Sequence, residues 1–257
     1  MTSWMRIGLF CGLCLGLTLS WASESLVTVP TRSGQQIAYW WMPQEGASAT
    51  VILLSGGRGG MGLREGEPRS NNFLIRSRAL FRSQGLNVAL LGNPSDMRDM
   101  DDDWRLSEAH RTDVQNVMID IRARSPTPVW LVGTSRGTVS ATALALALGG
   151  QLSGVVLTAS ITHQNEAAAL PRQAIDQLRL PVLIYHHRHD ACRVTPAREA
   201  ENIFRGLAQA RVKKLMLVEG GQNPTGNPCQ ALHWHGFIGM EERAVNDIAT
   251  WIRDPQP

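Results

Sequence analysis

The most informative segment of the sequence is VWLVGTSRG, residues 129–137. Its first four residues are apolar, as in a buried strand, and an Ala- and Leu-rich segment with helical spacing follows at residues 136–148. Between them, residues 133–137 form the pattern G-x-S-x-G. A strand, a sharp turn and a helix around such a serine are typical of a nucleophile elbow, whose glycines make room for a strained serine backbone. We therefore predict that Ser135 is a nucleophile; the alternative is an ordinary strand-to-helix turn with a capping serine.

Segments rich in β-forming residues alternate with helical segments along the chain. We predict strands at residues 26–30, 36–42, 50–54, 87–91, 129–132, 154–157, 181–186 and 213–218. We predict helices at residues 72–84, 107–124, 136–148, 164–178, 196–210 and 236–252, the fourth of them broken by Pro171. The first two strands should be antiparallel, and the later alternation predicts a parallel sheet covered on both faces. The expected fold class is α/β, with one domain and about eight strands.

The amino terminus reads as a targeting signal. A lone Arg6 precedes the apolar stretch 7–19, and the small-x-small pattern at residues 20–22 suits cleavage. We predict a signal peptide at residues 1–22, an exported (periplasmic or secreted) mature domain at residues 23–257, and no stable membrane association after cleavage. The alternative is an uncleaved anchor.

The composition excludes some classes of partner. Hydrophobic residues make up 43% of the chain and charged residues 18%, which is ordinary for a globular protein, and the formal net charge is +3. No stripe of Lys and Arg stands out, so we expect no nucleic-acid binding. The acidic cluster at residues 99–103 does not fit the spacing of a calcium loop, and we expect it to be a solvated loop.

The elbow and the order of elements resemble the α/β-hydrolase superfamily over residues 26–252. The chain is most similar to small exported bacterial hydrolases related to the dienelactone-hydrolase and esterase groups. This resemblance implies a nucleophile, an acid and a histidine in that chain order, each on a loop after a strand.

The resemblance assigns the acid to Asp190, which follows the strand at residues 181–186. The alternatives are Glu219 and Asp96 as acids, or a purely structural role for Asp190 as a helix cap. It assigns the base to His235, because Gly236-Phe237 leads into the last helix as in the H-G-F pattern of relatives. The rival base is His233, which we otherwise expect to pack beside the site or to contact substrate.

An acyl-transfer site also needs donors for the oxyanion. One is expected to be the backbone N–H of Arg136. The other should come from the glycine-rich loop at residues 55–60, where the resemblance implies Gly57 as the donor. Ser55 stands where relatives carry histidine, so Arg58 is an alternative donor as well as a possible substrate contact. The loop lacks the terminal G-K-S/T of a phosphate-binding loop.

Two cysteines remain after signal cleavage, Cys192 and Cys229. An oxidising compartment favours their pairing. Because one lies just after Asp190 and the other just before His235, a disulfide between them would join the acid loop to the base loop.

The predicted function is a serine hydrolase that cleaves a carboxylic ester, or a thioester or amide, of a small molecule without metal or organic cofactor. Ser135 would attack, His235 would transfer the proton, and Asp190 would orient His235. Two alternatives remain. One is a non-catalytic binding protein on the same fold. The other is a zinc protein that uses Asp190 and the histidines, which are His186, His187, His189, His233 and His235. The segment between the strands at 154–157 and 181–186 leaves room for only a small helical cap, so we expect an open cleft.

Overall fold

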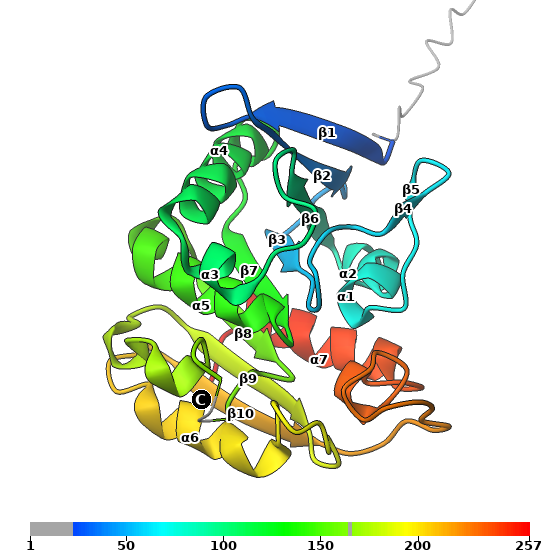
Figure 1. Ribbon diagram of the computed structural model, residues 1–257, viewed down its shortest axis with the longest axis vertical. Helices are drawn as coiled ribbons and strands as arrows, with labels where there is room; N and C mark the ends of the chain where they lie inside the picture. The colour runs from blue at the N-terminus through cyan, green and yellow to red at the C-terminus, as the bar shows by residue number, and fades with distance from the viewer. Residues whose placement is uncertain (1–22, 164–165) are drawn as a thin grey trace, which may run out of the picture.

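The computed structural model describes residues 23–163 and 166–257, so the predicted signal peptide at residues 1–22 lies outside the described residues. An eight-stranded sheet with the order β1-β2-β6-β3-β7-β8-β9-β10 forms the centre of the molecule (Figure 1). Its strands are β1 (Ser25–Pro30), β2 (Gln36–Met42), β3 (Ala49–Leu54), β6 (Leu86–Pro94), β7 (Val129–Thr134), β8 (Gly154–Thr158), β9 (Val182–His187) and β10 (Lys213–Val218). β2 pairs antiparallel with β1 and β6, and the remaining neighbours are parallel. The predicted sheet, including its antiparallel start, is confirmed.

Helices cover both faces of the sheet. They are α1 (Phe73–Arg76), α2 (Arg78–Ser83), α3 (Asp102–Leu106), α4 (Glu108–Arg124), α5 (Gly137–Leu148), α6 (Ala200–Gly206) and α7 (Glu241–Arg253). Apolar side chains of α4, α5 and α6 pack on one face, and those of α1, α2 and α7 pack on the other. In the described part of the chain, no helix combines the length and apolar character needed to cross a bilayer.

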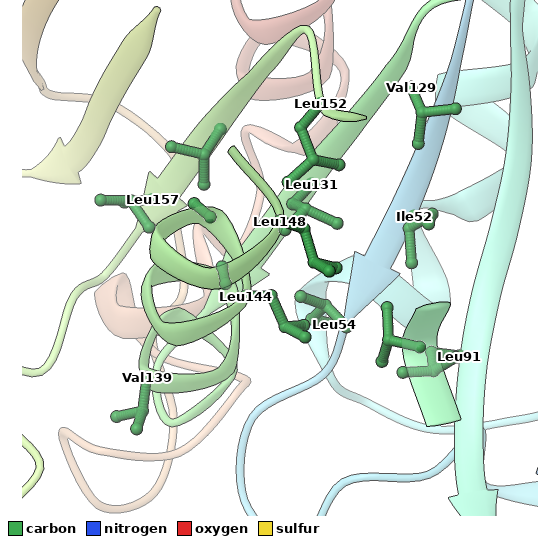
Figure 2. Close-up of a cluster of buried hydrophobic side chains, with 14 of the residues drawn as sticks. Ile52, Leu54, Leu91, Val129, Leu131, Val139, Leu144, Leu148, Leu152 and Leu157 are labelled. Atoms are coloured by element: carbon green, nitrogen blue, oxygen red, sulfur yellow. The ribbon is translucent and has the colours of Figure 1, made fainter. Parts of the chain in front are cut away.

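Helix α5 is fixed firmly to the sheet. Figure 2 shows Val139, Leu144 and Leu148 along α5, with Leu131 and Leu157 on the strands, and all five belong to one buried cluster. Burying each such side chain stabilises the fold by about 1.5–3 kcal/mol relative to an exposed position. The turn that precedes α5 is therefore held in place by a helix that is packed tightly against the sheet.

Several predicted helices are shorter than expected. The helix expected at residues 72–84 is two helices, α1 and α2, because Ser77 leaves the helical range at ψ 3°. The last helix begins at Glu241 rather than at residue 236, since Phe237 and Gly239 adopt positive φ angles of 57° and 72° and reverse the chain. The helix expected at 196–210 is reduced to a 3-10 turn and α6, after an extended Pro196.

The cap insertion was wrongly predicted to be helical. Its described part holds two 3-10 turns, η2 (Leu170–Arg172) and η3 (Ile175–Gln177). Pro171 removes a backbone donor, and Ala169 before it is extended at ψ 142°, which prevents a continuous helix.

The acidic cluster at residues 99–103 is also more ordered than the predicted solvated loop. The carboxylate of Asp101 accepts a hydrogen bond from the backbone N–H of Trp104 at 2.8 Å and caps α3. Asp102 forms an ion pair with Arg136 at 2.8 Å. This pairing ties α3 to the turn before α5.

Candidate active site

Ser135 lies in the turn between β7 and α5, with a left-handed backbone at φ 53°. The geometry depends on its glycine neighbours. A Cβ on Gly133 would lie 2.5 Å from the carbonyl oxygen of Gly137, and one on Gly137 would lie 2.0 Å from that of Leu54. The strained serine and the two obligatory glycines are what the G-x-S-x-G pattern predicts.

Asp190 follows β9 and is 4% exposed. Its Oδ1 accepts from the backbone N–H of Cys192 at 2.9 Å, and its Oδ2 lies 3.0 Å from Nδ1 of His235. Burial opposes the ionisation of Asp190, but hydrogen bonds from His186 and His235 outweigh it and hold the pKa of the carboxyl well below its ordinary value. Asp190 is therefore a carboxylate at neutral pH.

Two further side chains bind the same carboxylate oxygen, and sequence reasoning missed this role for both. The hydroxyl of Thr195 donates to Oδ2 of Asp190 at 2.9 Å, and lies 3.1 Å from Nδ1 of His235. Nε2 of the fully buried His186 lies 3.3 Å from Oδ2 of Asp190 and 2.9 Å from the carbonyl oxygen of Thr195. The only feature of the sequence that points to this network is that an otherwise apolar strand ends in polar residues.

His235 lies in the 3-10 turn Trp234–Gly236 and is 5% exposed. Glycine is required at 236, because a Cβ there would lie 2.0 Å from the carbonyl oxygen of Ala231. The guanidinium of Arg76 donates to the carbonyl of Gly236 and holds this turn against α1. Since Nδ1 of His235 faces Asp190, Nε2 is the nitrogen left for proton transfer.

Ser135 and His235 line one cavity of about 330 Å³, together with the glycine loop after β3. No hydrogen bond joins the Ser135 hydroxyl to His235 within the described residues. Catalytic hydrogen bonds are often long in unliganded sites and tighten when substrate binds. The structure thus brings Ser135, Asp190 and His235 into one site at the carboxyl ends of β7, β9 and the loop after β10.

Solved structures share this architecture. An esterase from Pyrococcus furiosus superposes with a TM-score of 0.66 at 12% identity, covering 90% of each chain. A serine hydrolase without a lid from Xanthomonas campestris superposes with a TM-score of 0.58 at 15% sequence identity, covering 90% of this chain and 93% of that one. The chain has the α/β-hydrolase fold. A cold-adapted esterase from an Arctic metagenomic library is also similar (TM-score 0.59, 16% identity, 91% and 94% coverage). No family model and no curated protein sequence matches the chain.

The oxyanion donors of an α/β hydrolase come from the residue after the nucleophile and from the loop after β3. In this chain that loop touches the nucleophile, since a Cβ on Gly56 would lie 2.9 Å from Cβ of Ser135. Gly57 has a positive φ of 59° and lines the cavity. Within the described residues, the backbone N–H groups of Gly57, Arg58 and Arg136 donate to no protein acceptor. All three therefore remain available to an oxyanion.

The two predicted substrate contacts differ in position. Arg58 lines the cavity, and its side chain is 77% exposed with a loose ion pair to Asp99 at 3.6 Å. His233 packs beside the site, edge-on against Trp234 with ring centroids 6.1 Å apart, and is not among the residues that line the cavity; a contact with substrate stays a prediction.

The rival acids lie elsewhere. Glu219 is 59% exposed and pairs with Arg188 at 2.7 Å, and Asp96 pairs with Arg32 at 2.8 Å. The described residues show no hydrogen bond from either of them to His235, whose Nδ1 lies 3.0 Å from Asp190.

The histidine-rich loop does not form a metal cluster. The ring of His187 stacks on Trp234 with centroids 4.9 Å apart, and its Nε2 lies 3.0 Å from the carbonyl oxygen of Gly220. Its Nδ1 accepts from the backbone N–H of His189, and burial lowers the pKa of His187. Among the described residues, no group of three or more His, Cys, Asp or Glu side chains is arranged to hold a metal ion.

The predicted disulfide is confirmed: Cys192 and Cys229 are joined. Cys192 is buried beside Asp190, and Cys229 lines the cavity near His235. The bond therefore connects the acid loop directly to the loop that carries the base.

Proposed function

We propose that this protein is a serine hydrolase that cleaves carboxylic esters of small molecules through an acyl-enzyme, with Ser135, His235 and Asp190 as its triad. One observation carries the proposal: a strained serine at φ 53° shares a cavity with a histidine whose Nδ1 lies 3.0 Å from a buried, ionised aspartate. This is the arrangement that turns a serine hydroxyl into a nucleophile. Thioesters and amides react through the same steps and are variants of the proposal.

Each residue has one task in the proposed reaction. Ser135 Oγ attacks the carbonyl carbon while Nε2 of His235 takes its proton. Asp190 keeps Nδ1 of His235 protonated and stabilises the imidazolium, which it can do because its own pKa is depressed. The N–H of Arg136 and one from Gly57 or Arg58 stabilise the oxyanion. His235 then protonates the leaving alcohol. Water attacks the acyl-enzyme through the same proton transfers and releases the acid.

The cavity supports a preference for short acyl groups. It measures about 330 Å³, and Ser70, Asn71 and Asn72 give one side of it a polar character. No described residue of the insertion between β8 and β9 lines it, so the cavity opens directly to the surface. A long alkyl chain would gain little burial there. We further propose that the chain is exported through its amino-terminal signal and acts in the periplasm or outside the cell.

The test is hydrolysis of p-nitrophenyl acetate, butyrate and octanoate by the mature protein. Activity should fall along this series. Ser135→Ala should lower kcat by about three orders of magnitude or more, since loss of a triad member disables the whole unit. Ser83→Ala, which changes an exposed serine on α2, is the matched control and should retain full activity. Equal activity of wild type and Ser135→Ala would overturn the proposal.

A further inference from the structure

Arg105 on α3 is an unusual residue. Its side chain is among the largest in the fold, yet it is only 1% exposed. Within the described residues no carboxylate forms an ion pair with it; the nearby charges are Asp101 and Asp102, which attract it, and Arg136, which repels it. Burial lowers the pKa of Arg105 to about 10, so the guanidinium remains charged at neutral pH. A buried cation without an ion pair is costly and persists only where other groups satisfy it.

Three of the four acceptors that satisfy Arg105 belong to the two elements that supply the oxyanion donors. Its Nη2 donates to the carbonyl oxygens of Ser55, at 3.4 Å, and Gly57, at 3.2 Å. Its Nη1 donates to the hydroxyl of Ser140 on α5, at 3.0 Å. Nε donates to the carbonyl of Met100 at 3.3 Å. One guanidinium thus bridges the glycine loop and the helix that follows the nucleophile.

One of these bonds also acts on a candidate donor itself. The carbonyl of Gly57 shares its peptide group with the N–H of Arg58, whereas the carbonyl of Ser55 shares its peptide group with the N–H of Gly56, which is not a candidate donor. A hydrogen bond from a cation to a carbonyl polarises the whole peptide and makes its N–H a stronger donor. The neighbouring ring of His110 adds no competing charge, because burial and the charge of Arg105 lower the pKa of His110 to about 3.

We propose that Arg105 is a positioning residue for the oxyanion hole: it sets the spacing between the 55–60 loop and α5 and strengthens the N–H donor of Arg58. This inference rests on the proposed function, because an oxyanion hole has a role only in acyl transfer. The residue touches no substrate, since it does not line the cavity.

Arg105→Met removes the charge and the donors while keeping much of the apolar stem. With p-nitrophenyl acetate we expect kcat to fall about 10- to 100-fold, less than the loss of a direct donor, and KM to stay within about twofold. Rates are normalised to sites titrated with a phosphonate, so that a smaller active fraction does not count as a lower kcat. Arg82→Met on α2, outside the cavity, is the matched control.

An alkyl boronic acid, which forms a tetrahedral adduct on the serine, separates this role from a merely structural one. Its Ki should rise in Arg105→Met by about the factor by which kcat falls, whereas inhibition by the carboxylate product should change little. An unchanged boronate Ki would overturn the inference even if kcat fell. If Arg105→Met does not fold, Arg105→Lys and Ser140→Ala provide the test, and full kcat and boronate affinity in both would overturn it.

Hydrogen exchange gives a reading that does not depend on turnover. Peptides covering residues 55–60 should exchange faster in Arg105→Met than in wild type, and unchanged exchange would overturn the positioning role. The two proposals fail differently. If wild type shows no Ser135-dependent hydrolysis, the proposed function is wrong and the catalytic part of this inference falls with it. If wild type is active and titrated Arg105→Met keeps full kcat, only the inference about Arg105 is wrong.

Discussion

Replacing both Cys192 and Cys229 by alanine should weaken the fold and the site together. The disulfide joins residues separated by 37 positions. For a loop of that length, the chain-entropy model gives a loss of about 4 kcal/mol in the free energy of unfolding at 25 °C. In a domain of this size each kcal/mol corresponds to about 2–4 °C, so the melting temperature should fall by about 8–16 °C.

The effect on catalysis follows from the position of the bond. Without it, the segment between β10 and His235 keeps only a few internal backbone hydrogen bonds, such as those from Thr225 to Leu232 and from Gln230 to Asn227. His235 can then drift from Asp190, and a misplacement near 1 Å lowers kcat by about 100-fold. We expect a loss of about 10- to 100-fold in kcat for ester hydrolysis.

The assays are urea unfolding at pH 7 and hydrolysis of p-nitrophenyl acetate, each with and without a reductant. Wild type treated with reductant should match the double variant in both, whereas the double variant itself should not respond to reductant. Equal urea midpoints for oxidised wild type and the double variant would refute the stability argument. An unchanged kcat would refute the claim that the disulfide holds the base loop.

Two further substitutions test the site. Thr195→Val removes one donor to Asp190, a hydrogen bond to a charged group worth about 1.5–3 kcal/mol. Burial opposes the ionisation of Asp190, but hydrogen bonds from His186 and His235 hold its folded-state pKa well below the ordinary value, so the charge that Thr195 binds is present at pH 7. Urea unfolding at pH 7 should therefore show this deficit, with Thr195→Ser close to wild type; a Thr195→Val protein as stable as wild type would contradict the hydrogen-bond argument. Gly56→Ala places a Cβ 2.9 Å from that of Ser135 and should lower the free energy of unfolding by about 1–3 kcal/mol and abolish most of kcat. Gly150→Ala, which has open space around it, should change neither quantity. Equal effects of the two substitutions on kcat would contradict the steric argument.

The sequence predicts the sheet and the strained turn around Ser135 well, because both depend on local patterns. Buried parallel strands appear as short apolar runs, and the two glycines around Ser135 are required by contacts within the turn and with the neighbouring strand. The disulfide was also predictable, since two cysteines flank the acid and the base.

The rest depends on long-range contacts that no local pattern records. Arg105 looks like an ordinary helix arginine in the sequence, and only the fold brings it against Ser55, Gly57 and Ser140. His233 was the rival of His235 as base, and the 3-10 turn at residues 234–236 directs His235 toward Asp190. The missing helix at residues 164–178 follows from proline and extended backbone, whose effect outweighed the helical spacing.

The central claim is that Ser135 is an activated nucleophile. The most direct measurement is intact mass after treatment with a fluorophosphonate, followed by peptide mapping. We expect one covalent adduct per chain on Ser135 in wild type, no adduct in Ser135→Ala, and labelling slowed by orders of magnitude in His235→Ala. Absence of labelling in folded wild type, or an adduct on another residue, would contradict it.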